Sequence, residues 1–460
     1  MKLILLSGGS GKRLWPLSND SRSKQFLKML TCSGNELESM VQRLWRQLDL
    51  NQLLDISYIS TSVTQVDIIQ SQLGTQIPLI IEPERRDTFP AIILAATYLY
   101  SIIGVDLNEV ITVMPVDPFV ENQFFDKVKD LEGVIKQSGM DIVLIGVNPT
   151  YASTKYGYII PDNAERNNQQ SQTYINVKGF KEKPTEEQAQ QLIEQHALWN
   201  CGVFAFKLGY MINQLEKRGL STQYDEIIRN YERLPKISFD YEIVEKAEKV
   251  AVIPYKGYWK DLGTWNTLTE DMQSNIIGRG SMSDDCINTH LINELDIPVV
   301  VLGTSNMVVA TSPDGILVTD KSTSHHVKEI VKDLGQRPMF EERRWGWYRV
   351  LDYKKSTEGI EVLTKRLCVF AGKNLSYQYH HKRSEVWTVV EGEGEFVLDD
   401  ELSYVKMGDV LHIPLGAKHG IRAIKDLEII EIQMGSKLEE EDIVRLFMSW
   451  EEMKKSIKNK

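Results

Sequence analysis

Short apolar runs alternate with amphipathic segments over the first 270 residues of the chain. Continuous apolar runs are typical of strands buried on both faces of a sheet, and apolar residues three and four positions apart are typical of helices that cover such a sheet. The alternation predicts a doubly wound α/β fold. The expected strands are Lys2–Leu6, Asp55–Ser60, Leu79–Ile81, Val110–Met114, Ile142–Val147 and Ile175–Phe180.

The pattern changes twice further along the chain. Gly, Ser, Asn and Asp accumulate around Met272–Asp285, and short β-like runs divided by turn sequences follow, which predicts a small β-rich connector over residues 271–340. After the charged segment Lys328–Arg344, strands with close turns continue to about Met434, which predicts a separate all-β barrel in residues 341–460. We expect a helical tail after the barrel, with acidic Glu439–Asp442 and basic Lys454–Lys460.

Composition and charge argue against several classes of protein. A chain of 460 residues, 42% hydrophobic and 25% charged, is expected to form two or three soluble domains. The formal charge of −11 and the lack of a Lys/Arg tract argue against a nucleic-acid or membrane partner. No apolar stretch has signal-peptide or membrane-spanning length, so we expect a cytoplasmic protein, and we expect a homo-oligomer. The four cysteines lack C-x-x-C spacing and are expected to be reduced thiols.

A glycine-rich loop follows the first expected strand and ends in two cations, Lys12 and Arg13. Glycines let backbone N–H groups approach a polyphosphate, so we expect Gly8, Gly9, Gly11 and Lys12 to bind a nucleotide. The loop fits neither the Walker pattern nor the dinucleotide fingerprint. Taken alone, its glycines could also serve only a tight turn.

Two aspartates stand where a magnesium ion could be held. Asp117 comes after the apolar run Val110–Met114, at the carboxyl end of an expected strand, where open α/β sheets bind ligands. Asp261 stands between two tryptophans and before a glycine, a setting that could hold it rigidly. Each aspartate alone could be a turn or cap residue. Lys24, however, follows the glycine loop closely enough to share its site.

These residues resemble the motifs of the bacterial mannose-1-phosphate guanylyltransferases, many of which are fused to a type II phosphomannose isomerase. The resemblance covers nearly the whole chain, and its motifs are the glycine loop through Ser18, K-Q-F-L at Lys24–Leu27, F-x-E-K-P at Phe180–Pro184, W-N-C-G at Trp199–Gly202 and W-x-D-x-G-x-W at Trp259–Trp265. It implies that Arg13 and Lys24 neutralise the nucleotide phosphates. It also implies that Asp117 and Asp261 hold Mg²⁺.

The resemblance also implies a sugar-phosphate site. Glu182 would accept sugar hydroxyls, Lys183 would meet the sugar phosphate, and Asn200 would also touch the sugar; we expect Gly157 in the same site. In the implied reaction, an oxygen of mannose 1-phosphate attacks the α-phosphorus of GTP, so that GDP-mannose forms and pyrophosphate leaves.

The chain departs from the family pattern near the expected base pocket. Pro115–Pro118 reads P-V-D-P where the family has P-A-D-H, and Arg85–Pro90 reads R-R-D-T-F-P where it has G-R-N-T-A-P. Glu82 and Arg86 could hydrogen-bond a base edge, but their spacing does not select guanine. A pyrophosphorylase for another nucleotide or sugar therefore stays open. The intact cations and aspartates argue against a third reading, a sensor that binds without turnover.

Residues 372–419 carry two linked patterns of a metal-binding barrel. The first, G-x5-Q-x-H-x4-E-x6-G, contains Gln378, His380 and Glu385, and the second, G-x5-P-x-G-x2-H, contains His419. Both are close to the cupin motifs, with Gln378 in place of the usual first histidine. Strand alternation brings Gln378 and His380 to one face, and a neighbouring strand can add His419. Two imidazoles and two oxygens would then surround a divalent metal, expected to be Zn²⁺.

The same stretch resembles type II phosphomannose isomerases. The resemblance implies that the metal orients mannose 6-phosphate or fructose 6-phosphate for proton transfer between the first two carbons. Val386 stands after the motif glutamate, where His is common, and Gly420 after the last motif histidine, where Arg is common. A structural or regulatory metal-binding cupin is therefore the alternative to an active isomerase. By strand alternation, His381 and His412 should point away from the metal.

The sequence thus predicts an α/β protein with a Rossmann-like doubly wound nucleotidyltransferase domain at residues 1–270, a β-rich connector at 271–340 and a C-terminal all-β cupin barrel at 341–460. The leading hypothesis is a magnesium-dependent enzyme that makes GDP-mannose.

Overall fold

A nine-stranded sheet forms the centre of the N-terminal half, in the order β5-β4-β1-β6-β11-β8-β12-β10-β9. The computed structural model describes residues 1–9, 11–32, 34, 36–162, 173–335, 337–440 and 442–458. The sheet's strands are β1 (Lys2–Ser7), β4 (Ser57–Ser62), β5 (Leu79–Glu82), β6 (Val110–Pro115), β8 (Ile142–Val147), β9 (Tyr158–Pro161), β10 (Ile175–Lys181), β11 (Leu198–Lys207) and β12 (Val250–Tyr255).

Each strand predicted for this half is present, but the sheet is mixed. The strands β5, β4, β1 and β6 are parallel neighbours, whereas β11 runs antiparallel between β6 and β8. The motif segment Trp199–Gly202 belongs to the strand β11, which was not predicted as a strand. The pairing of β11 with β8 changes register between Asn200 and Phe204, as at a β-bulge.

Helices cover both faces of this sheet, as the doubly wound α/β prediction requires. Alternate residues of β1 face opposite cores, since Leu3 and Leu5 pack in one cluster and Ile4 in the other. The first face packs against α1 (Met40–Leu50), α2 (Val66–Leu73), α4 (Phe124–Ser138) and α6 (Glu186–Glu194). The second packs against α3 (Thr88–Thr97), α7 (Leu208–Lys217), α8 (Tyr224–Arg229) and α9 (Phe239–Glu242). None of the helices described in this structure is long and apolar enough to cross a membrane.

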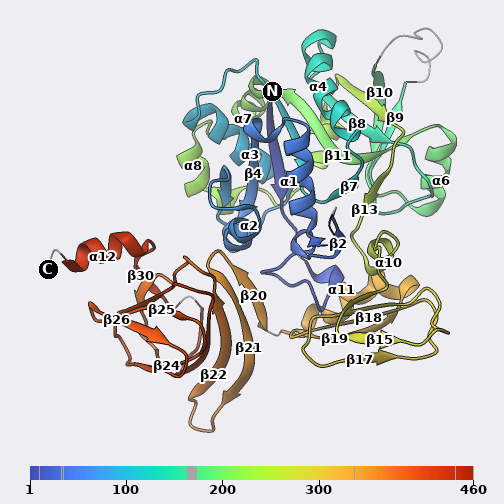
Figure 1. The fold of residues 1–460 in the computed structure, drawn as a ribbon. Coiled ribbons are helices and arrows are strands. Elements are labelled where there is room, and N and C mark those ends of the chain that lie inside the picture. Colours follow the sequence, from blue (N-terminus) through green and yellow to red (C-terminus); the bar gives the residue numbers. More distant parts are fainter. Residues whose placement is uncertain are drawn as a thin grey trace.

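The β-rich connector consists mainly of short parallel strands. One sheet has the order β14-β16-β18-β19, and β15 pairs with β17. The bounds are β14 (Ile276–Gly278), β15 (Gly280–Met282), β16 (His290–Asn293), β17 (Val299–Val301), β18 (Met307–Ser312) and β19 (Gly315–Asp320), and the short helix α11 (Val327–Ile330) follows. Figure 1 shows this unit beneath the nine-stranded sheet, with α11 beside the N-terminal loop.

The connector shares a hydrophobic core with the segment after the glycine loop. The cluster joins Leu14 and Leu17 of that segment to Leu268 of α10 (Trp265–Thr269) and to Ile292 and Val308 of the connector. Hydrogen bonds follow the same contact: Trp265 Nε1 donates to the Trp15 carbonyl at 3.1 Å, and Ser312 Oγ donates to the Pro16 carbonyl at 2.7 Å. The glycine loop is thus held on its far side by a different part of the chain.

The C-terminal barrel consists of two sheets around a third apolar cluster. One sheet contains β20 (Phe340–Arg343), β21 (Gly346–Lys355), β22 (Glu361–Val369), β29 (Leu427–Gly435), β24 (Arg383–Glu391) and β27 (Val410–Ile413). The other contains β26 (Glu401–Lys406), β25 (Glu393–Leu398), β28 (His419–Ala423), β23 (Tyr377–Tyr379) and β30 (Val444–Phe447). The fold-class prediction of an α/β domain followed by an all-β barrel is confirmed.

The predicted helical tail is wrong for its first part. Val444–Phe447 forms the strand β30, which pairs with β23, and only the following segment is the helix α12 (Trp450–Lys458). The backbone of β23 needs a partner on this side, and Phe447 stacks on Tyr377 with ring centroids 6.4 Å apart. Pairing with a distant strand therefore overrides the local helical preference.

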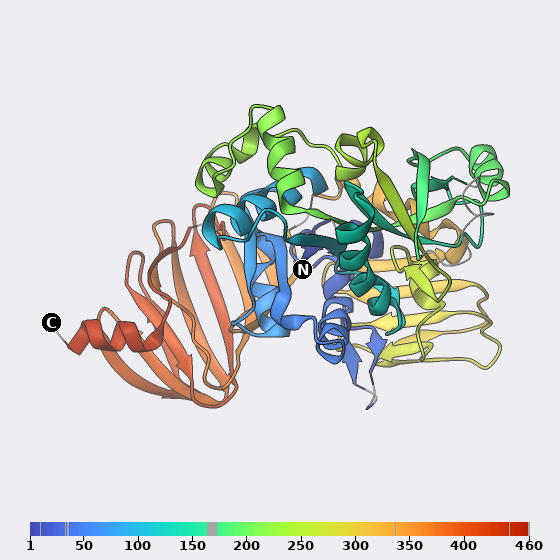
Figure 2. The same ribbon diagram turned by 90° about the horizontal axis from the view of Figure 1, so that it is seen from above.

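The first strand of the barrel, β20, connects the barrel to the N-terminal half through hydrogen bonds and an ion pair. Ser21 Oγ donates to Glu341 at 3.1 Å, and Ser71 Oγ of α2 donates to Glu342 at 2.8 Å. Arg343 forms an ion pair of 3.2 Å with Asp67 of α2. In both views the barrel lies beside the N-terminal half, and α12 projects at its outer side (Figures 1 and 2).

Truncation of a side chain in the core that the connector shares with the segment after the glycine loop should strongly reduce stability. Leu268 is fully buried there, so Leu268→Ala should lower the free energy of unfolding by about 2.7–5 kcal/mol. The same truncation at Leu302, which is 68% exposed on the connector, should change it by less than about 0.5 kcal/mol. Denaturant unfolding of both variants measures the difference, and equal losses would contradict a core shared across these units.

Candidate functional site

The glycine loop presents its backbone to an open space. An added Cβ at Gly8 or Gly9 would meet no atom within 4 Å, and Gly9 has a φ of +110°, which disfavours other residues. Gly11 has the opposite surroundings, because a Cβ there would lie 2.6 Å from Ser23 Cα and 2.8 Å from the Asn19 carbonyl oxygen. Gly8 and Gly9 thus offer approach to a ligand, and Gly11 lets the loop pack on the next turn.

Lys24 lies between the two aspartates that the sequence singles out. Its Nζ is 2.9 Å from Asp117 Oδ2 and 2.6 Å from Asp261 Oδ1. The spacing of the carboxylates follows from a short ladder: β7 (Pro118–Val120) pairs with β13 (Trp259–Asp261), and Asp261 lies opposite Pro118. A pair of strands far apart in the sequence therefore places both carboxylates at one point.

Electrostatics favour the charged forms of Lys24 and Asp261. Burial opposes ionisation of Asp261, but Lys24, and then Arg13, lower its pKa below the usual value. For Lys24, burial lowers the pKa, but Asp117 and Asp261 outweigh it and raise the pKa above that of a free lysine. Carboxylates side by side are the oxygen ligands that Mg²⁺ prefers, so the donor set fits this ion.

These residues belong to one cavity of about 260 Å³. Gly8, Gly9, Gly11, Arg13, Lys24 and Asp117 line it, together with Ser23, Gln25 and Lys328. Lys12, expected to bind the nucleotide, is turned elsewhere: its Nζ is 3.3 Å from Asp20, and it lines a neighbouring hollow. Lys328 was missed because it stands more than 300 positions further along the chain.

The four expected sugar-site residues gather at a second place. The Asn200 backbone N–H donates to the Gly157 carbonyl at 2.8 Å, and Lys183 forms an ion pair of 2.7 Å with Glu182. A Cβ at Gly157 would clash with Glu182 Oε2 and lie 2.8 Å from Phe180 Cζ, so a side chain here would displace this carboxylate. The structure therefore brings the predicted set together.

Asp240 is a further member of this group that the sequence analysis missed. Asn200 Nδ2 donates to its Oδ1 at 2.6 Å. Burial, and then the negative charge of Glu182, raise the pKa of Asp240 to about 6. The only sequence signal was a carboxylate at the start of a short helix, where a cap is the ordinary interpretation.

Glu82 and Arg86, expected at the base edge, have partners within the fold. Tyr231 OH donates to Glu82 Oε2 at 2.7 Å, and Arg86 donates to the main-chain carbonyls of Leu234 and Glu232. Among the residues that the structure describes, neither lines the cavity of the glycine loop. Between them and α3, Asp87 has a φ of +74°, and its carboxylate caps the helix. A strained residue at this point is typical of a functional segment.

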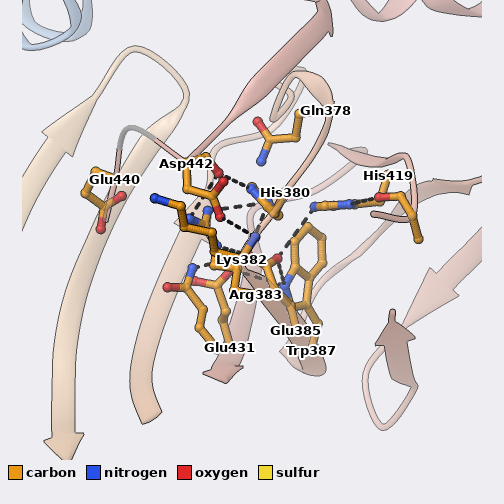
Figure 3. A network of polar contacts seen from close by, with 12 residues as sticks. Gln378, His380, Lys382, Arg383, Glu385, Trp387, His419, Glu431, Glu440 and Asp442 are labelled. Atoms are coloured by element: carbon orange, nitrogen blue, oxygen red, sulfur yellow. Dashed lines mark hydrogen bonds and ion pairs between the residues drawn. The ribbon is translucent and has the colours of Figure 1, made fainter. Parts of the chain in front are cut away.

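Three residues converge in the barrel: His380 from the turn before β24, Glu385 from β24 and His419 from β28 (Figure 3). Their ligand atoms lie within 4.8 Å of one another, and all three residues are buried. His380 Nδ1 contacts the Asp442 carbonyl at 2.6 Å and His419 Nδ1 the Ala417 carbonyl at 3.0 Å, so each Nδ1 can donate and leave Nε2 as a metal ligand.

The surroundings of these residues fit a divalent cation. His419 Nε2 is buried without a hydrogen-bond partner in the part of the chain described. Burial lowers the pKa of His380 to about 4, so its ring is neutral, the form that binds metals. Gln378 pairs with His419 in the β23–β28 ladder, and it lines a cavity of the barrel together with Glu385. As strand alternation predicts, His381 and His412 are exposed.

A second set of polar groups surrounds Glu385. Arg383 Nε donates to Glu385 Oε1 at 2.8 Å, and Trp387 Nε1 donates to both Glu385 and Glu431 at 3.1 Å (Figure 3). Burial, and then the charge of Glu385, raise the pKa of Glu431 to about 8. The barrel therefore holds a buried carboxylic acid that can exchange a proton near neutral pH.

The cavity that these residues line has a volume of about 430 Å³ and reaches the N-terminal half. Its wall carries five cations, Arg343, Arg344, Lys365, Arg383 and Arg445, and also Asp67 and Val66 of α2. The wall also contains the carboxylates of Glu385, Glu431 and Glu440, and Arg343, Lys365 and Arg383 are paired with Asp67, Glu440 and Glu385. The cavity is therefore lined by charges of both signs, with one more cation than carboxylates.

Comparisons with known proteins decide the family. A family model described as Nucleotidyl transferase matches residues 2–276. The chain belongs to this family. A second model, described as Mannose-6-phosphate isomerase C-terminal, matches residues 334–447 of this nucleotidyltransferase. The resemblance stated from the sequence motifs is thereby confirmed for both parts of the chain.

Relatives of this nucleotidyltransferase extend over nearly its full length. Alginate biosynthesis protein AlgA of Pseudomonas aeruginosa is 30% identical over 474 residues, covering 96% of this chain and 95% of AlgA. Mannose-1-phosphate guanylyltransferase 2 of Escherichia coli O157:H7 is 29% identical, covering 96% of each chain. A crystal structure described as mannose-1-phosphate geranyltransferase from Thermus thermophilus has a TM-score of 0.61 and 26% identity, covering 73% of this chain and 99% of that one.

Asp240 makes the stability of this nucleotidyltransferase depend on pH. Its pKa of about 6 in the folded protein exceeds the value of about 3.9 for an unfolded chain, so the folded state binds more protons between these values. Stability should therefore fall as pH rises through this window, and Asp240→Asn should stabilise the protein more at pH 8 than at pH 5. Thermal unfolding at both pH values measures this. Asp284→Asn, at an exposed position, is the control, and a pH-independent effect of Asp240→Asn would contradict the prediction.

Proposed function

We propose that the N-terminal half is a magnesium-dependent mannose-1-phosphate guanylyltransferase, which makes GDP-mannose and pyrophosphate from GTP and mannose 1-phosphate. The observation that carries the proposal is the arrangement of Lys24 between Asp117 and Asp261, at the open face of a glycine loop. The name of one relative, mannose-1-phosphate guanylyltransferase 2 of Escherichia coli O157:H7, supports mannose 1-phosphate and a guanine nucleotide as the substrates.

Each site residue has a role in the proposed reaction that follows from its chemistry. Asp117 and Asp261 would hold Mg²⁺, which screens the charge of the phosphates. Arg13 and Lys24 face the same cavity and stabilise the negative charge that develops on the leaving pyrophosphate. Glu182 and Asn200 bind the sugar, and Lys183 holds its phosphate so that one oxygen is directed at the α-phosphorus. The reaction needs no covalent intermediate, because the sugar phosphate itself is the nucleophile.

Pyrophosphate release from GTP and mannose 1-phosphate tests this function. Asp261→Asn removes a magnesium ligand and a partner of Lys24, so we expect kcat to fall by about 100-fold or more. Asp271→Asn is a matched control, since Asp271 binds Lys260 and Tyr258 instead. Equal activity of the Asp261 variant and the wild type would contradict the assigned role. Turnover with another nucleotide or sugar phosphate, but not with these, would favour the alternative specificity instead.

For the barrel, we propose a divalent metal site, with Zn²⁺ as the expected ion, formed by Gln378, His380, Glu385 and His419. The convergence of buried ligand atoms supports it, as does Nε2 of His419, which makes no hydrogen bond within the described residues and lies 3.5 Å from Glu385 Oε2. We further propose that the site interconverts mannose 6-phosphate and fructose 6-phosphate. The metal would polarise the sugar oxygens. Glu431 lines the same cavity and can move a proton between C1 and C2 of the sugar, which needs no other reactant.

The cations of this cavity can replace the arginine that the family has at the position of Gly420. Lys365 and Arg383 come from β22 and β24 and both line the cavity. Lys365 pairs with Glu440 at 2.7 Å and Arg383 with Glu385 at 2.8 Å, so we propose that their remaining N–H groups stabilise the enediolate oxygens. A structural or regulatory cupin would retain the metal but show no isomerase activity.

Metal analysis separates these possibilities. His419→Gln should reduce bound metal after dialysis against Zn²⁺ by at least half and abolish isomerase activity, because a buried ligand is lost. His412→Gln changes an exposed histidine of the same barrel and should retain both properties. Metal content is measured by mass spectrometry and isomerisation by conversion of fructose 6-phosphate. Full metal retention by His419→Gln would contradict the site.

A further inference from the structure

Lys328, near the end of the connector, lines the cavity of the glycine loop. It stands on α11, which contacts the short helix η1 (Lys12–Leu14) at the end of the glycine loop. Val327 is buried and fixes this contact, while the next residue, Lys328, is exposed and lines the cavity together with Gly8 and Gly9. Figure 1 shows α11 beside the N-terminal loop.

The ammonium group of Lys328 has no competing partner in the described structure. No carboxylate of the described residues lies within ion-pair distance of it, whereas Lys12, the cation of the loop itself, pairs with Asp20 at 3.3 Å. Lys24 is held by Asp117 and Asp261. Of the lysines near the loop, Lys328 is therefore the one whose charge is available to a ligand.

Lys328 adds to the positive charge of the cavity. The lining contains three cations, Arg13, Lys24 and Lys328, and one carboxylate, Asp117. Because Lys24 is already paired with Asp117 and Asp261, Lys328 increases the positive charge that a polyphosphate meets there. The chain as a whole has a formal charge of −11, which repels a polyphosphate, so local positive charge at the cavity matters for capture.

We propose that Lys328 is a phosphate-binding residue of the nucleotide site, which the connector contributes to the polyphosphate of the nucleoside triphosphate. The sugar-phosphate group of Gly157, Glu182 and Asn200 lies outside the lining of this cavity, so Lys328 acts on the nucleotide and not on the sugar phosphate. This inference rests on the proposed transferase function.

The test compares two lysines of the same segment. Lys328→Ala should raise the KM for GTP about tenfold, as expected for loss of one charged hydrogen bond, and leave the KM for mannose 1-phosphate unchanged. Lys328→Arg should restore most of the affinity, because it keeps the charge. Lys332→Ala is the matched control: Lys332 is also exposed, but it lines the neighbouring hollow beside Asp20.

Two results would overturn the proposal. One is a KM for GTP that is the same in Lys328→Ala and wild type. The other is an equal change in the KM for both substrates, or in Lys328→Ala and Lys332→Ala, since a structural effect of α11 would act in that way. Thermal unfolding of each variant shows whether the fold is kept.

A binding measurement separates this inference from the proposed function. Inorganic tripolyphosphate with Mg²⁺ is titrated into the full-length protein by calorimetry, which needs no turnover. If the wild type releases no pyrophosphate from GTP and mannose 1-phosphate, the transferase assignment fails. Weaker tripolyphosphate binding by Lys328→Ala than by Lys332→Ala would still support the role of Lys328. Equal binding by both variants, or none by the wild type, would overturn it.

Discussion

One ammonium group between two carboxylates determines the geometry of the nucleotide site. Lys24, Asp117 and Asp261 come from three distant segments, and each is costly to bury alone, because a charge loses its hydration in a protein interior. Together they satisfy one another. The pairing of β7 with β13 sets the spacing, and the core under the glycine loop sets the position of Lys24. Loss of Lys24 would leave two part-buried carboxylates side by side without their cation.

Local patterns were sufficient to predict the elements and the residue types of the sites. The apolar runs gave the strands of the first half. Asp117 was predicted from its place at a strand end, Asp261 from its place between two tryptophans, and Lys24 from its closeness to the glycine loop, and the structure brings the three together. The same reasoning paired Gln378 with His380 and placed His412 outside the metal site. These predictions depend on periodicity, which the sequence displays directly.

The points at which the structure differs from the sequence predictions all involve contacts between segments that are distant in the chain. Lys12 stands in the loop yet turns to Asp20, and Lys328 lines the cavity from α11, near the end of the connector. Asp240 joins the group of Gly157, Glu182 and Asn200 through a hydrogen bond from Asn200, and β30 pairs with β23. No local pattern reports such pairings, since they depend on tertiary packing and not on neighbours in the chain.

The core that the glycine loop shares with the connector has a consequence for how the chain can be divided. Leu14 and Leu17 are covered by Ile292 and Val308, and the Trp15 and Pro16 carbonyls accept hydrogen bonds from Trp265 and Ser312. A fragment cut after residue 270 would carry the phosphate loop but expose this apolar surface to water. Recombination during evolution could thus exchange the barrel more easily than the connector, which is inherited together with the loop it supports.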